Sequence, residues 1–92
     1  MNTVGIVHTV PALAASVDEA LAAALPGYRR MHLVDPLLLQ EALRAGVTGW
    51  ILREVDNHVQ YFAGQGAQAA LITCSSIGSA AAHAQAATGV PV

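Results

Sequence analysis

The chain has 92 residues, of which 54% are hydrophobic and only 11% are charged, and its net charge at pH 7 is -2. A chain of this length holds one small domain, and such an apolar composition excludes intrinsic disorder. The sequence has only four basic residues, which are too few to form a positively charged surface that binds nucleic acid. A single cysteine cannot form an internal disulfide, so a reducing compartment, by default the cytoplasm, is expected. Charged residues interrupt every apolar stretch before the roughly 20 residues of a membrane helix, so we expect no membrane span.

The first third of the chain predicts two strands joined by a helix. Residues 4–8 form a β-branched, apolar run that is typical of a strand buried on both faces. Across residues 13–25 every fourth position is apolar, which predicts a helix with Asp18 and Glu19 on its opposite face. Residues 28–34 predict a second strand, whose arginines indicate a sheet edge.

The rest of the chain repeats this alternation. Asp35 precedes a proline and fits the N-cap of a short helix, a structural role that we favour over ligand contact. A longer helix follows, with an apolar stripe from Ile51 to Phe62. Residues 69–73 predict a third buried strand, and an alanine-rich helix follows over about 77–87. The last four residues are typical of the start of a fourth strand, and we therefore expect a fragment.

Strands that alternate with helices predict an α/β fold: an incomplete, flavodoxin-like parallel sheet of order 2-1-3, with helices on both faces. The third strand would then have an open edge that favours self-association. In such sheets ligands bind outside the carboxyl ends of the strands, where the winding direction reverses. The candidate site residues at these tips are His8, Thr9 and Val10 after the first strand, and Thr73, Cys74, Ser75 and Ser76 after the third.

Cys74 is the strongest candidate for chemistry, because it ends a buried strand and a helix is predicted to follow. Amides and the dipole at a helix N-terminus favour a thiolate and bind anions such as carboxylates. Ser75 and Ser76 can cap this helix or add a hydroxyl donor. An inert, buried cysteine is the alternative. For His8 and Thr9, a binding role stands beside a structural one, as a histidine bonded inside the fold and a helix-capping threonine.

No metal site and no cofactor are predicted. His32, His58 and His83 are scattered, and no two histidines have the i, i+4 spacing of a helical metal site. Residues 64–69 match a GxGxxA pattern, but they precede a strand, whereas a dinucleotide-binding loop follows one.

Four segments, taken in order, carry a family resemblance: VGIVHTVPAL at 4–13, HLVDP at 32–36, LITCSSIG at 71–78 and GVPV at 89–92. By these motifs the chain resembles the N-terminal half of the aspartate/glutamate/hydantoin racemase superfamily, whose enzymes use cysteine and no pyridoxal phosphate. The resemblance implies two flavodoxin-like halves that each give one cysteine to a cleft. One thiolate removes the proton α to a carboxylate or carbonyl, and the other thiol protonates the opposite face.

By this resemblance Cys74 matches the first catalytic cysteine, Ser75 and Ser76 match carboxylate-binding positions, and residues 8–10 match the loop that lines the cleft. The second cysteine motif is absent from the sequence, so we expect this chain alone to be inactive as a racemase. Its expected partners are a small carboxylate substrate and either a missing C-terminal half or a second copy. Two alternatives stay open: a decarboxylase or isomerase relative that uses one cysteine, and a non-catalytic module that binds small anions.

Overall fold

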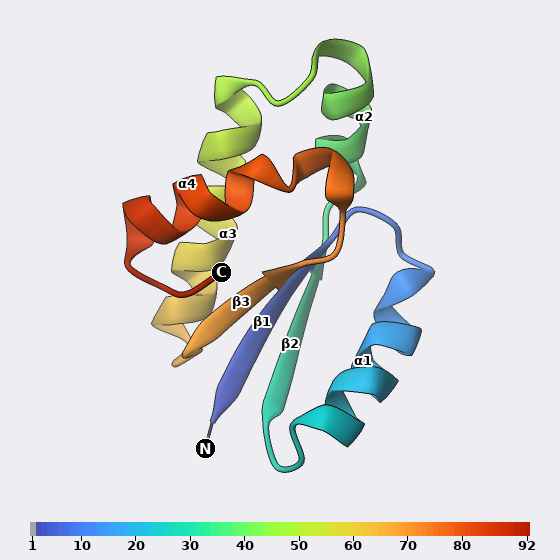
Figure 1. Ribbon diagram of the computed structural model, residues 1–92, viewed down its shortest axis with the longest axis vertical. Coiled ribbons are helices and arrows are strands. Elements are labelled where there is room, and N and C mark those ends of the chain that lie inside the picture. Colours follow the sequence, from blue (N-terminus) through green and yellow to red (C-terminus); the bar gives the residue numbers. More distant parts are fainter. Residues whose placement is uncertain (1) are drawn as a thin grey trace.

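Three apolar runs of the chain form one parallel sheet in the computed structural model, which describes residues 2–92 (Figure 1). The strands are β1 (Thr3–His8), β2 (Arg29–Val34) and β3 (Ala69–Ile72). Their order, β2-β1-β3, confirms the predicted topology and the predicted edge position of the second strand. The helices are α1 (Leu13–Ala24), α2 (Pro36–Ala45), α3 (Gly49–Gly64) and α4 (Ser79–Thr88), and a short 3-10 turn, η1 (Ser75–Ile77), precedes α4. Among the described residues, no helix is both long and apolar enough to cross a membrane.

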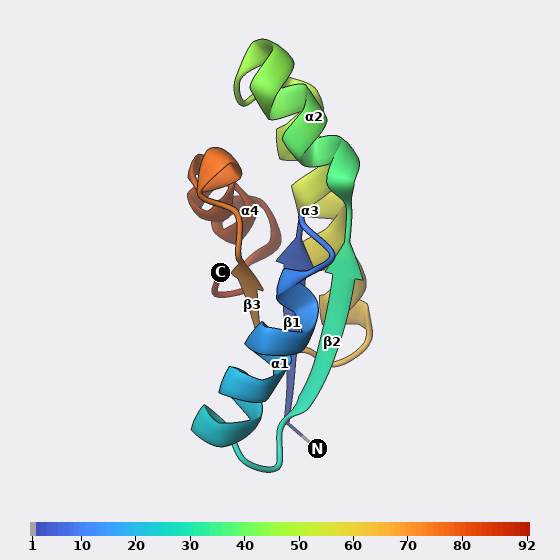
Figure 2. The same cartoon turned by 90° about the vertical axis from the view of Figure 1, so that its right-hand side faces the viewer.

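The central strand β1 is buried along its whole length, as predicted, because strands flank it and helices cover both its faces. Its side chains alternate between these faces. Gly5 faces α3, where an added Cβ would lie 2.2 Å from the ring of Phe62. His8 faces the other way, toward α1. The sheet therefore separates α1 from α3 and α4 (Figures 1 and 2).

The hydrophobic core lies between the sheet, α3 and α4. The predicted stripe of α3 is fully buried and consists of Ile51, Val55, Val59 and Phe62. Ala80 and Ala84 of α4 are buried in the same cluster, and their small side chains allow α4 to pack closely on α3. Thr48 caps α3 by accepting a hydrogen bond from the amide of Ile51 at 3.4 Å.

The rotation of α1 differs from the sequence prediction. Asp18 was expected on the face away from the sheet together with Glu19, but its carboxylate forms ion pairs with Arg30 and His32 of β2. No residue of α1 is fully buried. Because α1 buries little apolar surface, apolar packing does not set its rotation about its own axis. The ion pairs of Asp18 with β2 therefore determine which side of α1 faces the sheet.

The segment after β3 also differs from its prediction. The regular helix begins at Ser79, and the residues directly after Cys74 form the 3-10 turn η1 instead. Neither Ser75 nor Ser76 caps a helix, because η1 and α4 have no side-chain cap hydrogen bond. Ile77 is fully buried in the core. Its burial gives a physical reason for the tight turn between Cys74 and α4.

The outer edge of β3 is partly covered by the last residues of the chain. The amide of Ala70 donates a hydrogen bond to the carbonyl oxygen of Pro91 at 2.8 Å, and Val90 and Val92 pack against the core. The prediction of a fully open edge is therefore wrong at Ala70. Residues 89–92 form no strand, and Leu71 of β3 stays 40% exposed. Self-association through this edge remains a prediction.

Candidate functional site

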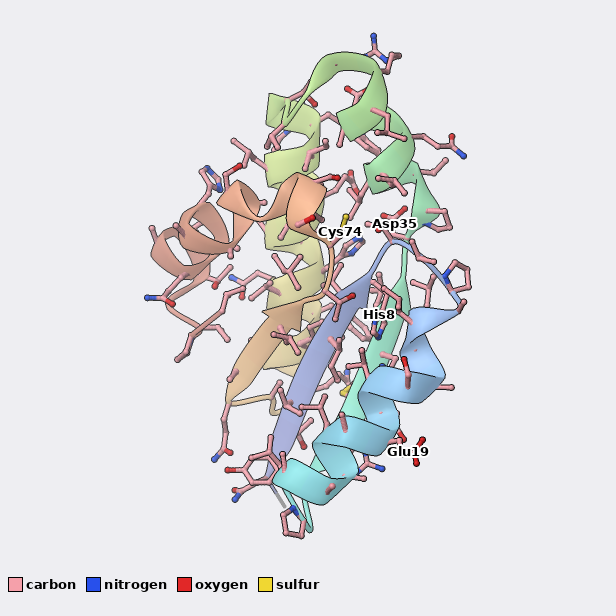
Figure 3. All side chains as sticks on the ribbon, turned by 45° about the vertical axis from the view of Figure 1, so that its right-hand side comes forward. His8, Glu19, Asp35 and Cys74 are labelled. Carbon is pink, nitrogen blue, oxygen red and sulfur yellow. The ribbon has the colours of Figure 1, made fainter. Side chains whose placement is uncertain are left out.

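The carboxyl ends of the three strands lie at one end of the sheet (Figure 3). Backbone hydrogen bonds continue the pairing past the strand ends: the amide of Asp35 donates to the carbonyl of His8 at 2.8 Å, and the amide of Thr73 donates to the carbonyl of Val7 at 3.1 Å. Figure 3 shows His8, Asp35 and Cys74 toward this end. The arrangement agrees with the predicted location of the candidate residues at the strand tips.

A side-chain hydrogen bond joins the ends of β1 and β3. The Nδ1 atom of His8 lies 2.8 Å from the Oγ1 atom of Thr73, although the two residues are far apart in the sequence. Thr73 Oγ1 is also 3.4 Å from the carbonyl oxygen of Val7. His8 has no exposed surface. Two of the predicted site residues are thus in direct contact, and Cys74 is the next residue along the chain.

The other predicted site residues have different surroundings. Cys74 is half-buried, and its side chain packs against the hydrophobic core. Val10, Ser75 and Ser76 are exposed. Thr9 is buried, and its Oγ1 atom has no hydrogen-bond partner among residues 2–92. The first-strand tip is therefore mostly interior, whereas the serines after Cys74 are open to solvent.

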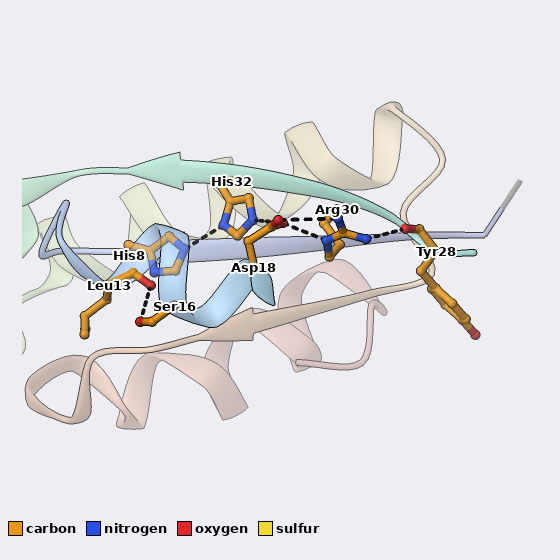
Figure 4. A network of polar contacts seen from close by, with 7 residues as sticks. All are labelled: His8, Leu13, Ser16, Asp18, Tyr28, Arg30 and His32. Atoms are coloured by element: carbon orange, nitrogen blue, oxygen red, sulfur yellow. Dashed lines mark hydrogen bonds and ion pairs between the residues drawn. The ribbon is translucent and has the colours of Figure 1, made fainter. Parts of the chain in front are cut away.

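His8 also begins a chain of polar contacts that the sequence prediction missed (Figure 4). His8 Nε2 lies 2.8 Å from His32 Nδ1, and the two rings stack with centroids 5.1 Å apart. His32 Nε2 lies 2.8 Å from Asp18 Oδ1, and Arg30 Nε donates to the same oxygen at 2.7 Å. The alternation of Arg30 and His32 on one face of β2 was visible in the sequence. Their contact with Asp18 depends on strand register and on the rotation of α1.

Neighbouring groups determine the charge of Asp18 and of His8, which lie at the two ends of this network of polar contacts. Hydrogen bonds from Arg30 and then His32 lower the pKa of Asp18 from its usual 3.8 to about 2, so that the carboxylate is ionised at neutral pH. Burial, and to a smaller degree the charge of His32, lower the pKa of His8. The buried imidazole of His8 is therefore neutral at pH 7.

The network restricts the tautomers of the two histidines. With both rings neutral, these three contacts are satisfied when Thr73 donates to His8, His8 donates to His32, and His32 donates to Asp18; the single hydroxyl proton of Thr73 is then not available to the carbonyl of Val7. A proton added to His32 reverses this order, because His32 then donates to both neighbours and His8 donates to Thr73. The contacts therefore form a continuous path for a proton from Asp18 to the residue before Cys74.

We expect Asp18→Asn to destabilise the protein above about pH 4 and to lose this effect in acid. The native pKa of about 2 lies below the usual 3.8, so the unfolded state binds more protons between these values. The contribution of Asp18 to stability is complete above 3.8 and disappears as the pH falls toward 2. Urea unfolding of both proteins at a series of pH values measures this difference. Glu19→Gln is the matched control, since Glu19 is exposed and lies on the same helix. A constant difference between Asp18→Asn and wild type across this pH range would contradict the assignment.

Asp35 has two roles at the end of β2. One carboxylate oxygen accepts a hydrogen bond from the amide of Leu37 at 3.1 Å, which confirms the predicted N-cap of α2. The other oxygen lies 2.9 Å from Nε2 of His58 on α3. Asp35, Glu54 and His58 form a group whose ligating atoms all lie within 4.8 Å of one another, close enough to hold a metal ion. The spacing of histidines alone does not reveal this group, but the i, i+4 spacing of Glu54 and His58 was a usable sequence pattern.

A groove of about 450 Å³ lies along α2 and is lined by Leu37, Gln40, Glu41, Arg44 and Trp50. It includes none of the predicted site residues. The candidate site residues at the strand ends therefore do not line this groove.

No family model, no curated protein and no solved structure matches this chain. The racemase resemblance therefore remains a prediction that rests on the four sequence motifs.

Proposed function

We propose that the carboxyl edge of the sheet transfers protons, with Cys74 removing and returning a hydrogen α to the carboxylate or carbonyl of a small amino acid, hydantoin or related compound. The observation that carries this proposal is the 2.8 Å contact between His8 and Thr73, which joins the end of β1 to the residue that precedes Cys74 after β3. In a parallel sheet of order 2-1-3 these two strands flank the point where the winding reverses and ligand crevices occur.

The proposed step needs one base and a set of donors. The Cys74 thiolate takes the α proton and becomes a thiol, while negative charge develops on the substrate carboxylate or carbonyl oxygen. The exposed hydroxyls of Ser75 and Ser76 are available to stabilise that charge. The network from Asp18 to Thr73 holds in place the side chain of the residue that directly precedes Cys74 in the sequence. The proposal also requires a reducing compartment such as the cytoplasm, because Cys74 acts as a free thiol.

Racemisation and exchange make different demands on this site. Inversion needs a second thiol on the opposite face of the substrate, which the family resemblance assigns to another half. Exchange of the α hydrogen of one enantiomer with solvent needs Cys74 alone, because its thiol proton exchanges with water. Hydrogen exchange is therefore the appropriate assay for this chain.

The test follows α-hydrogen exchange in D2O by proton NMR, for each enantiomer of aspartate, glutamate and 5-substituted hydantoins. We expect exchange of one enantiomer, and a loss of about 100-fold or more in Cys74→Ala and in Cys74→Ser, whose hydroxyl is too weak an acid to supply a base. Ser79→Ala, a change in α4 outside the predicted site, serves as control. Exchange that is undetectable in wild type or unchanged in Cys74→Ala would overturn the proposal. Carboxylate binding without exchange would favour the anion-binding alternative.

A further inference from the structure

Three side chains that can bind a metal ion, from one face of α3 and from the end of β2, lie close together. They do not include Cys74. Glu54 and His58 lie one turn apart on α3, and Asp35 follows β2. Nε2 of His58 is 2.9 Å from Oδ2 of Asp35, and these two side chains are only 17% and 15% exposed. Glu54 is half-buried, and its carboxylate completes a group within 4.8 Å.

The charges of this cluster are not balanced by an ion pair to an arginine. In the described part of the chain the paired arginines are Arg30 with Asp18 and Arg44 with Glu41, and no ion pair involves Glu54. The imidazole of His58 is the partner of Asp35, whereas no basic group is paired with the carboxylate of Glu54 in this part of the chain. The cluster therefore favours the binding of a positive ion.

The donor set indicates the class of ion. One imidazole nitrogen with two carboxylate oxygens suits divalent transition metals such as Zn²⁺, whereas Mg²⁺ and Ca²⁺ prefer oxygen ligands only. With metal–ligand bonds of about 2.1 Å, two ligands lie about 3.0 Å apart at right angles and about 3.4 Å apart in a tetrahedron. The 2.9 Å separation between Asp35 and His58 is close to the right-angle value, and the two side chains would move apart slightly to bind a tetrahedral ion. The hydrogen bond from the amide of Leu37 holds the Asp35 carboxylate in place.

A buried hydroxyl without a partner among residues 2–92, that of Thr9, lies on the residue next to the backbone contact between His8 and Asp35. Thr9 is 3% exposed. The carbonyl of the preceding residue, His8, accepts the amide of Asp35, so Thr9 lies beside Asp35 at the strand ends. A metal-bound water is a donor that would satisfy this hydroxyl.

We propose that Asp35, Glu54 and His58 bind one divalent transition-metal ion, with a coordinated water hydrogen-bonded to Thr9. The ion replaces the hydrogen bond between His58 and Asp35 and links the end of β2 to α3. This site does not depend on the proposed function of Cys74.

Calorimetric titration of the chain with Zn²⁺ tests the proposal, and Glu54→Gln is the decisive variant. We expect wild type to bind one Zn²⁺ and Glu54→Gln to bind it at least about 10-fold more weakly. Glutamine keeps the size of the side chain, and the Asp35–His58 hydrogen bond remains. If the cluster were only a structural ion pair, the two proteins would titrate alike. Zn²⁺ should also raise the unfolding temperature of wild type more than that of the variant.

Two controls separate this site from adventitious binding. Asp56→Asn alters the Asp56–His83 pair, whose atoms are 3.0 Å apart but which lacks a third ligand, and it should leave Zn²⁺ affinity unchanged. Cys74→Ser should also leave it unchanged, and the Co²⁺ complex should show no thiolate-to-metal charge-transfer band. Equal affinities of wild type and Glu54→Gln, no Zn²⁺ binding to wild type, or loss of binding in Cys74→Ser would each overturn the proposal. Unfolding of the metal-free proteins verifies that Glu54→Gln is folded.

Discussion

Gly5→Ala is expected to destabilise the protein by about 3 kcal/mol or more, because a methyl group at this position has no room. An added Cβ would lie 2.2 Å from Cδ2 and Cγ of Phe62. These atoms are near the base of the ring, and Phe62 is 1% exposed in the centre of the core, so the ring cannot move away without displacing its neighbours. Urea unfolding measures the loss.

Two further variants test this cause. Gly64→Ala is the matched control, since nothing lies within 4 Å of a Cβ at Gly64, and alanine there should be neutral or stabilising at the end of α3. Phe62→Leu should cost less in the Gly5→Ala background than in wild type, with a coupling free energy of about 1 kcal/mol or more, because the smaller side chain relieves the overlap. Additive effects of the two changes would show that the strain is not at this contact.

His8→Leu is expected to cost about 2 kcal/mol at neutral pH, because it leaves Nδ1 of His32 without its partner and removes the side-chain bond between β1 and β3. Leucine has a similar volume, so the loss reports mainly on the polar contacts. Equilibrium unfolding in urea at pH 7 measures it. His83→Leu is the control, since His83 is exposed on α4, and its effect should stay within about 0.5 kcal/mol.

The cost of His8→Leu should depend on pH in a defined direction. The native pKa of His8 is below its usual 6.5, so the unfolded state binds more protons as the pH falls through that value. Wild type therefore loses stability below about pH 6.5 through this residue, and the variant does not. The difference between the two proteins should narrow from pH 7 to pH 5. A difference that widens in acid would contradict a neutral, buried His8.

The order of strands and helices could be predicted from the sequence because its causes are local. Periodic apolar residues fixed the stripe from Ile51 to Phe62, and a capping residue before a proline marked the start of α2 at Asp35. The apolar residues 4–8 predicted a strand buried on both faces, and β1 is such a strand. Alternating strands and helices then restrict the sheet to few topologies, which is why the order 2-1-3 and the location of Cys74 at a strand tip followed.

The sequence by itself thus determined the order of strands and helices, the order of the sheet, and the ends of β1 at His8 and β2 at Val34, whereas β3 ends one residue earlier than predicted, at Ile72. Only the tertiary structure decided which polar side chains meet. Asp18 joins His32 and His8 through a helix rotation that apolar periodicity did not predict, because α1 buries no residue fully. Asp35 meets His58 because a strand end and a helix face converge across the fold. Such contacts depend on register and rotation to within a few ångströms, and these are set by the packing of the whole chain rather than by any local pattern.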